Sequence, residues 1–306
     1  MCRFSQVERE KSRISIEGAL ALEAAFLDSK HALLPEYLRR LQIFKAGHMC
    51  SAKNGVFCCS VMISSASWEY RLKKSGDEMI ELKDVYKKYP NGVMAANGLN
   101  IKIKQGEFVY IVGPSGAGKS TVIKLIYREE KPTAGTVLVN GVNLSKIRDK
   151  RVPYFRRQIG VVFQDFKLLP TLTVYENVAF ALEVIEQDPP YIRKRVMEVL
   201  DQVGLKNKAR MLPSELSGGE QQRVSIARSI VNMPKVVIAD EPTGNLDPET
   251  SWEIMKILED INLTGTTVVM ATHNREIVNT NKHRVIAIES GKVVRDEQLG
   301  GYGYED

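Results

Sequence analysis

The amino-acid sequence predicts an α/β fold with a largely parallel sheet for residues 79–306. Short runs rich in Val and Ile alternate there with stretches of helical length, as in a buried parallel sheet that is covered by helices. A glycine-rich loop of the phosphate-binding type follows one of the first runs, and two acidic residues end a later one. The composition, with 43% apolar and 26% charged residues, is ordinary for a globular chain.

The first part of this region reads as strands around one loop and one helix. IELKDVY and FVYIVG are the first strand candidates, and the loop GPSGAGKS opens a helix that continues through TVIKLIY. TVLVNG is a further strand, and the Asn140–Gly141 pair at its end is a strong signal for a hairpin turn. The run IGVVF is the next buried strand.

The remainder alternates helices with strands. The stretch from about 165 to 215 carries two helical segments, YENVAFALEV and PPYIRKRVMEVLDQVG, so we expect a helical insert there. Three strands (VVIAD, TTVVMAT and RVIAIE) and two helices (VSIARSIV and PETSWEIMKILEDIN) follow it.

Residues 1–78 lack this order. Their serine-rich segments carry no motif, and only LLPEYLRRLQIF has apolar positions at helical spacing. We interpret the segment as a poorly ordered extension, or as an over-long start that leaves Met79 as the working initiator. An anchoring or regulatory helix is the alternative. All four cysteines precede Met79, which fits a reducing compartment without a disulfide framework.

Charge and hydropathy limit the setting in which the chain works. The formal net charge of +6 fits either a nearby anionic surface or lysines scattered over a solvated exterior. No apolar run approaches the roughly 18 residues that a membrane-spanning helix needs. The start does not read as a signal peptide, because Glu8 and Glu10 interrupt its basic region. We therefore expect a cytosolic protein whose membrane role comes through a partner.

The segment from Gly113 to Ser120 matches the phosphate-binding pattern G-x-x-x-x-G-K-[ST] between a strand and a helix, as this pattern requires. Its glycines let backbone N–H groups approach the α- and β-phosphates of a nucleotide. Lys119 reaches the β- and γ-phosphates, and the Ser120 hydroxyl ligates Mg²⁺. The candidate ATP-binding residues here are Gly113, Pro114, Ser115, Gly116, Ala117, Gly118, Lys119, Ser120 and Thr121.

Polar residues also follow three of the other predicted strands. Asp240 would hold Mg²⁺ through its water shell, and Glu241 would orient or deprotonate the water that attacks the γ-phosphate. Gln164 and His273 stand where strands become loops, the usual position of ligand contacts in such sheets. Alone, each of these residues could belong to a solvated turn or have a structural role. Residues 216–221 (LSGGEQ) form a second anion-binding pattern at a helix start.

In this order, the phosphate loop, Gln164, LSGGEQ, the Asp240–Glu241 pair, the residues up to Asp247 in NLD, and His273 resemble an ATP-binding-cassette (ABC) ATPase. The resemblance covers the chain from Ile80 onward. It implies an ABC-type P-loop NTPase domain with a helical subdomain and an antiparallel β edge. In that family two subunits pack head to tail around two ATP molecules, and the signature loop of one subunit caps the γ-phosphate held by the other.

The resemblance also implies the roles of single residues. Tyr89 would stack on adenine, and Gln164 would contact the metal and the nucleotide and link them to a membrane partner. The catalytic residues would be Glu241, His273 and Lys119, and the metal ligands Ser120, Gln164 and Asp240. The trans signature and dimer contacts would be made by Ser217, Gly218, Gly219, Glu220 and Asp247. ATP and Mg²⁺ are the expected cofactors.

Within the family, segments such as FQDFKLLPTLTVYENVAFALEV are most similar to cassettes that act in cell division with an integral membrane partner and control cell-wall hydrolases. An ATPase for lipoprotein release or macrolide export is the alternative, because it shares every catalytic residue. An ABC-type ATPase that works on nucleic acid is disfavoured, since fewer than a hundred residues separate the phosphate loop from the signature, without a sustained heptad. The expected partners are a second copy and an integral membrane protein, at the cytoplasmic face of the membrane, and no nucleic acid.

Overall fold

The computed structural model describes residues 78–303 of the 306-residue chain. The expectations for the segment before Glu78, including a helix over LLPEYLRRLQIF, lie outside the described residues. All four cysteines lie there too.

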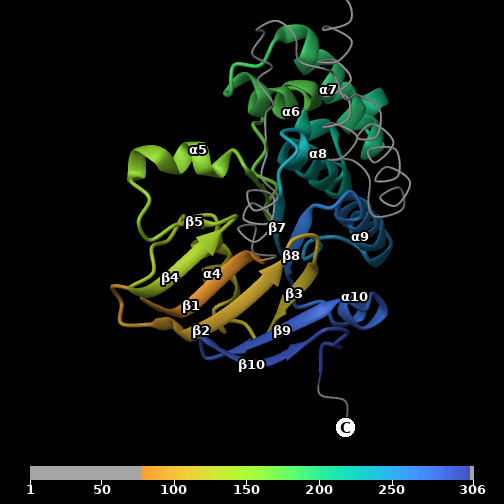
Figure 1. Ribbon diagram of the computed structural model, residues 1–306. Coiled ribbons are helices and arrows are strands. Elements are labelled where there is room, and N and C mark those ends of the chain that lie inside the picture. The colour runs from red at the N-terminus through yellow and green to blue at the C-terminus, as the bar shows by residue number, and fades with distance from the viewer. Residues whose placement is uncertain (1–77, 304–306) are drawn as a thin grey trace, which may run out of the picture. The chain divides into compact units, whose positions relative to one another are not determined.

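A six-stranded sheet forms the centre of the described part, in the order β10-β9-β3-β8-β7-β6 (Figure 1). Its five Val- and Ile-rich strands pair in parallel, and β10 alone pairs antiparallel, at one edge. The α/β class and the antiparallel edge are thus confirmed. The strands are β3 (Phe108–Val112), β6 (Ile159–Val162), β7 (Val236–Asp240), β8 (Thr267–Ala271), β9 (Arg284–Glu289) and β10 (Lys292–Glu297).

A second, antiparallel sheet has the order β2-β1-β4-β5. Asn140 and Gly141 join β4 to β5 with φ angles of 48° and 73°, the left-handed pair that a tight hairpin turn needs. Strand β2 was not predicted, because its first half is broken by Gly98 and only Leu99, Ile101 and Ile103 alternate as buried residues. The strands are β1 (Glu78–Lys88), β2 (Met94–Lys104), β4 (Ala134–Val139) and β5 (Val142–Asn143).

The helices cover both faces of the six-stranded sheet. Figure 1 shows α6 and α7 grouped with α8 at the opposite end of the domain from the four-stranded sheet. The two helices α6 and α7 belong to the stretch where a helical insert was expected. The helices are α4 (Lys119–Ile126), α5 (Val152–Arg156), α6 (Val174–Glu183), α7 (Pro189–Gln202), α8 (Gly218–Ile230), α9 (Pro248–Leu263) and α10 (Arg275–Thr280), with 3₁₀ turns at Asp149–Arg151, Lys206–Lys208 and Pro213–Glu215.

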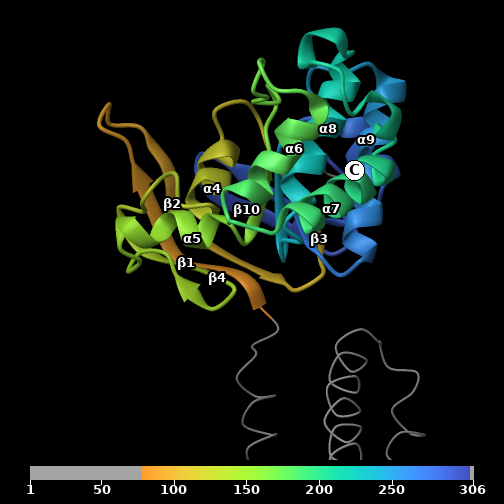
Figure 2. The same ribbon diagram turned by 90° about the horizontal axis from the view of Figure 1, so that it is seen from above.

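The alternation of side chains along β3 divides the interior into two hydrophobic cores. Val109 and Ile111 point into a core that α4 shares with both sheets, so α4 is packed between them. Phe108, Tyr110 and Val112 point to the other face, into a core built with α6, α7, α8 and α9. Figure 2 shows the domain turned by 90°, with α4 near β2 and α6, α8 and α9 at the other side. Since β3 is buried on both faces, the loop after it is held on a rigid base.

Within residues 78–303, none of the helices combines the length and the apolar character needed to cross a membrane.

Candidate nucleotide-binding site

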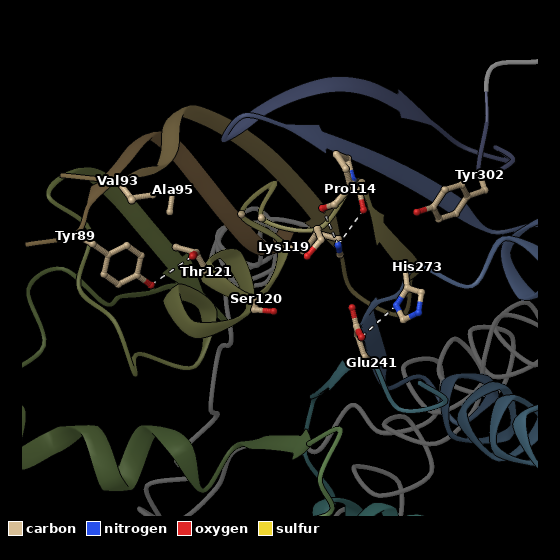
Figure 3. Close-up of a pocket in the computed structure, with 14 residues that line it drawn as sticks. Tyr89, Val93, Ala95, Pro114, Lys119, Ser120, Thr121, Glu241, His273 and Tyr302 are labelled. Carbon is tan, nitrogen blue, oxygen red and sulfur yellow. Dashed lines mark hydrogen bonds and ion pairs between the residues drawn. The ribbon is translucent and has the colours of Figure 1, made fainter. Parts of the chain in front are cut away.

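A cavity of about 630 Å³ opens at the carboxyl ends of the parallel strands (Figure 3). Its walls include every predicted loop residue from Gly113 to Thr121 except Ala117, together with Tyr89, Glu241 and His273. The parallel topology accounts for this arrangement, because the residues that follow β3, β7 and β8 all emerge at the same edge.

Two glycines of the loop allow a close approach that no other residue permits. A Cβ atom on Gly113 would lie 2.1 Å from the carbonyl oxygen of Ile288, and one on Gly118 would lie 2.3 Å from that of Ala95. Both glycines also have positive φ angles, 146° and 108°. The loop is thereby pressed between β9 and β2, with its backbone at the cavity wall.

The start of α4 is an open anion site. Helices α6, α8, α9 and α10 each begin with a side chain that accepts a backbone N–H, but the N-cap of α4 is Gly118 and provides none. The first N–H groups of α4 therefore need an outside acceptor, and the helix dipole favours a negatively charged one. Phosphate oxygens meet both requirements.

Lys119 places positive charge beside this helix start. Its side chain is buried, and its ammonium donates hydrogen bonds to the carbonyl oxygens of Gly113 (2.9 Å) and Pro114 (3.1 Å). These neutral acceptors hold the side chain along the loop without cancelling its charge. The ammonium thus stands ready for an anionic ligand.

Ser120 and Asp240 form a donor set that suits a divalent cation. The Ser120 hydroxyl donates to Oδ1 of Asp240 at 3.3 Å. Burial raises the pKa of the Asp240 carboxyl, the Ser120 hydrogen bond lowers it, and the adjacent Glu241 raises it again. A partly buried carboxylate in this position is stabilised by a cation, and hydroxyl and carboxylate oxygens are ligands that Mg²⁺ prefers. The residues present therefore fit Mg-ATP.

Glu241 and His273 meet at one end of the cavity. Oε2 of Glu241 lies 3.1 Å from Nδ1 of His273, and Figure 3 shows both side chains on the same side of the phosphate loop. Glu241 adopts a left-handed backbone conformation with φ 48°, which is rare for a residue with a side chain and common where geometry serves a function. Its N–H donates to the carbonyl oxygen of Ala271 in the neighbouring strand, and this bond holds the conformation.

Tyr89 lies at the other end of the cavity from His273 (Figure 3). It directly follows β1, and its hydroxyl is 3.3 Å from Oγ1 of Thr121 on α4. Lys87 places its ammonium 5.0 Å from the ring centroid. The phosphate loop thus separates an aromatic end of the cavity from an end with a carboxylate and an imidazole.

Among the residues predicted to bind the nucleotide or the metal or to act in catalysis, three do not line this cavity: Ala117, Asp240 and Gln164. The Ala117 side chain is buried. Asp240 contacts the phosphate loop through its hydrogen bond with the Ser120 hydroxyl. Gln164 is exposed. It lies beside the loop that follows β7, since a Cβ on Gly244 would be 3.2 Å from Nε2 of Gln164 and 3.5 Å from Oε2 of Glu241. Gln164 is therefore near Glu241 but outside the cavity, and its metal contact stays a prediction.

The signature residues form a separate helix start. Ser217 and Glu220 make a reciprocal capping box, in which each side chain accepts the backbone N–H of the other residue. Ser217 and Gly218 are exposed, whereas Gly219 is buried. None of them lines the cavity around the phosphate loop of the same chain.

Asp247 begins the neighbouring helix α9. Its carboxylate accepts the N–H of Thr250 at 2.9 Å, and the hydroxyl and N–H of Thr250 hold the pKa of Asp247 below its usual range. The side chain is exposed, so it both caps the helix and faces outward. Its contact with a second copy stays a prediction.

Three wall residues were not predicted from the sequence: Val93, Ala95 and Tyr302. Val93 directly precedes strand β2 and Ala95 belongs to it, so both were missed together with that strand. Tyr302 is brought to the cavity from the far end of the chain, and no local motif announced it.

Many known proteins are similar to this chain. The ABC transporter family model matches residues 96–244. The cell division ATP-binding protein FtsE of Bacillus subtilis (strain 168) is 72% identical over 228 residues, which are 74% of this chain and all of that protein. FtsE of Streptococcus pneumoniae serotype 2 (strain D39) is 64% identical over 74% of this chain and 99% of its own length.

A solved structure has the same fold. It is the dimeric structure of a post-hydrolysis state of an ATP-binding cassette bound to ADP and Pi, with 40% identity and a TM-score of 0.67. The match covers 73% of this chain and all of that one. The predicted ABC-type P-loop NTPase fold is thereby confirmed. The phosphate loop, the Asp240–Glu241 pair and the signature helix thus stand in a chain that belongs to the ABC-type ATPases, enzymes that hydrolyse ATP, and within them to the FtsE family.

Proposed function

We propose that this chain is the ATP-hydrolysing subunit of an FtsEX-like membrane complex, which couples ATP-driven closure of a homodimer to cell division and to control of cell-wall hydrolysis. The observation that carries the proposal is the separation of two anion sites within one chain. The uncapped start of α4 lines the cavity, whereas the exposed start of α8 lies outside it. Two copies packed head to tail would bring each α8 start to the other copy's cavity.

In this proposal the nucleotide lies along the cavity with its base near Tyr89 and its phosphates over the start of α4. Lys119 and the N–H groups of α4 bind the phosphates. Ser120 and Asp240 would hold Mg²⁺, with Gln164 as a further ligand, and the ion would neutralise charge on the phosphate oxygens.

Glu241 acts as the general base. His273 engages Oε2 of its carboxylate, which leaves Oε1 free to orient the attacking water and accept its proton. His273 thus keeps the carboxylate in place and senses the γ-phosphate at the same end of the cavity. Loss of that phosphate removes the anion that joins the two copies, and the dimer reopens.

Closure of the dimer is tested with Glu241→Gln, which keeps the shape of the side chain but removes the base. We expect the full chain with this substitution to bind Mg-ATP, lose nearly all turnover and form a stable dimer in light scattering. A strictly monomeric variant at saturating Mg-ATP, with and without the membrane partner, would contradict the proposed mechanism. Near-normal hydrolysis would remove Glu241 as the base.

A groove beside the loop after Gln164 supports a membrane partner. Its volume is about 600 Å³, and Phe163, Arg156 and Arg228 are among the residues that line it. Large apolar side chains are exposed on α5 and α6, which border it; they are Tyr154 (56% exposed) and Phe180 (45%). Such side chains at the border of the groove suit contact with an apolar protein segment.

Arg228 gives this groove a physical connection to the signature helix. From α8 its guanidinium donates to the carbonyl oxygens of Phe166 (2.9 Å) and Lys167 (2.7 Å), two residues with left-handed φ angles. A partner segment that moves this loop would therefore pull on α8. The coupling runs in both directions, because binding of ATP by two copies would also shift α8.

The catalytic residues are the same for a cell-division ATPase and for an ATPase of export or lipoprotein release, so the identity of the membrane partner distinguishes the two functions. We propose an FtsX-like integral protein, with the chain held at the cytoplasmic face of the cell membrane, because the identity to FtsE spans that protein's whole length. Purification of the full chain from membranes, with identification of the attached protein, tests this. An exporter or lipoprotein-release permease would favour the alternative. Salt-sensitive DNA binding would contradict both.

A further inference from the structure

The chain that follows β10 returns along α10 and brings Tyr302 to the cavity wall. Figure 3 shows the Tyr302 side chain on the same side of the phosphate loop as His273, with its hydroxyl directed toward the loop at Pro114 and Lys119. This is the end of the cavity opposite Tyr89. The residue therefore stands where the proposed site holds the terminal phosphate.

The backbone around Tyr302 is fixed from β10. The guanidinium of Arg295 donates to three consecutive carbonyl oxygens, those of Gly301 (2.7 Å), Tyr302 (3.1 Å) and Gly303 (2.8 Å). The planar fork of an arginine suits such a set of acceptors, and three bonds from one group define the path of the chain here.

Helix α10 fixes the same residue from its other side. The N–H of Tyr302 donates to Oδ1 of Asn279 at 2.7 Å, and the guanidinium of Arg275 lies 5.2 Å from the centroid of its ring. The ring also packs against the hydrophobic core beneath the sheet. Backbone and ring are thus both held before any ligand binds, as a preorganised binding residue requires.

The hydroxyl is the part of Tyr302 left without a role. Within residues 78–303 it has no hydrogen-bond partner, although the rest of the residue is tied down. A phenol hydroxyl is a donor, and a phosphate oxygen is among the strongest acceptors. We propose that Tyr302 is a nucleotide-binding residue whose hydroxyl donates a hydrogen bond to the terminal phosphate of a bound nucleoside triphosphate. This inference rests on the proposed nucleotide site.

The test measures binding of Mg-ATP and of Mg-ADP to the full chain carrying Glu241→Gln, at a concentration where light scattering finds monomers. Tyr302→Phe removes only the hydroxyl. We expect it to weaken ATP binding about 10-fold, the size of one hydrogen bond to a charged acceptor, and to leave ADP binding unchanged. Tyr191→Phe, which removes an exposed hydroxyl on α7, is the matched control and should alter neither.

Lys119→Ala separates failure of this inference from failure of the site itself. If Lys119→Ala abolishes binding while Tyr302→Phe binds ATP as the parent does, the site stands and the role of Tyr302 is wrong. Equal weakening of ATP and ADP would also contradict it, because the terminal phosphate would not be the acceptor. Unchanged binding of both nucleotides to Lys119→Ala would overturn the proposed site.

Discussion

At the scale of single residues, the negative charge of Asp240 destabilises the folded chain, and a bound cation would relieve this effect. Its carboxyl is partly buried beside Glu241, and among residues 78–303 the Ser120 hydroxyl is its one hydrogen-bond donor, at 3.3 Å. Its pKa in the folded chain is therefore raised, mainly by burial. Between the unfolded and the folded pKa the folded state binds more protons, so stability falls as pH rises through that window.

This residue gives the first prediction. Asp240→Asn removes the partly buried charge, so without nucleotide we expect the variant to melt about 2–4 °C above the parent at neutral pH, which corresponds to a relief of about 1 kcal/mol. In acid, where the parent carboxyl is protonated, the difference should vanish. Thermal melts across pH measure both, and the exposed Asp260→Asn should show no such pH dependence. A variant less stable than the parent at neutral pH would contradict the argument.

The phosphate-loop residues were predictable because neighbours in sequence build their geometry. Gly113 and Gly118 stand at fixed spacing within one loop, so the motif identifies them, although the backbone that they approach, at Ile288 and Ala95, is distant in sequence. Tyr302 was not predictable in this way. It reaches the cavity only because Arg295 and Asn279 hold the end of the chain against α10, and no spacing rule describes contacts of that kind.

At the scale of elements, the helix starts around the site divide into two kinds. In α8 and α9 the side chains of Ser217 and Asp247 each accept one N–H of the first turn and leave other N–H groups for a ligand, whereas α4 has no side-chain cap. The cap of α9 thus gives Asp247 a structural role in addition to the interface role proposed for it. Two substitutions separate these roles.

Asp247→Ala should lower the free energy of unfolding by about 1 kcal/mol, because α9 loses its N-cap. Asp247→Asn keeps a good capping group and should leave unfolding in denaturant unchanged. If the charge of Asp247 acts across the dimer interface, the Asn variant should still lose ATPase activity. If Asp247→Asn is fully active while Asp247→Ala is destabilised, Asp247 acts only as the N-cap of α9 and has no role at the interface.

Most central elements were predictable, and those that were missed are interrupted or short. The parallel strands are continuous Val and Ile runs because both of their faces are buried, and this pattern is strong. Strand β2 is interrupted by Gly98, where φ is 72° and Tyr86 occupies the space of a side chain. Helices α5 and α10 span five and six residues, which is too short for a periodic pattern.

At the scale of the whole molecule, the proposed dimer depends on charge at the start of α8. Gly218 is exposed, and a Cβ there would make only ordinary contacts, 3.6 Å to Leu246 and 3.9 Å to Phe166. Gly219 is different, since its Cβ would lie 2.2 Å from Cγ2 of Thr250. Gly218 is therefore the position where a charge can be tested without disturbing the chain that carries it.

Gly218→Asp should leave ATP binding by the monomer unchanged but abolish the ATP-dependent dimer of the Glu241→Gln chain. Its carboxylate suits the dipole of its own helix and repels the phosphate of the other copy. Gly218→Asn has the same shape without the charge and should still dimerise. Light scattering with Mg-ATP compares the three chains, and dimers of the Asp variant would contradict the head-to-tail arrangement.

Removal of residues 1–78 should leave ATP hydrolysis intact. FtsE of Bacillus subtilis matches over 228 residues, which are all of its own length, so that relative has no counterpart of this segment. The truncated chain keeps every residue of the proposed site. Steady-state hydrolysis by both chains provides the measurement, and a folded but inactive truncation would assign the segment a role in turnover.

The tight fit between α8 and α9 restricts the order in which substitutions can accumulate. Because Cγ2 of Thr250 occupies the space that a side chain on Gly219 would need, we expect Gly219→Ala to destabilise the packing of α8 against α9 while Thr250 is present. Thr250→Ser removes that methyl group and opens the space. In evolution, a substitution of Thr250 in α9 would therefore have to come before a substitution of Gly219 in α8.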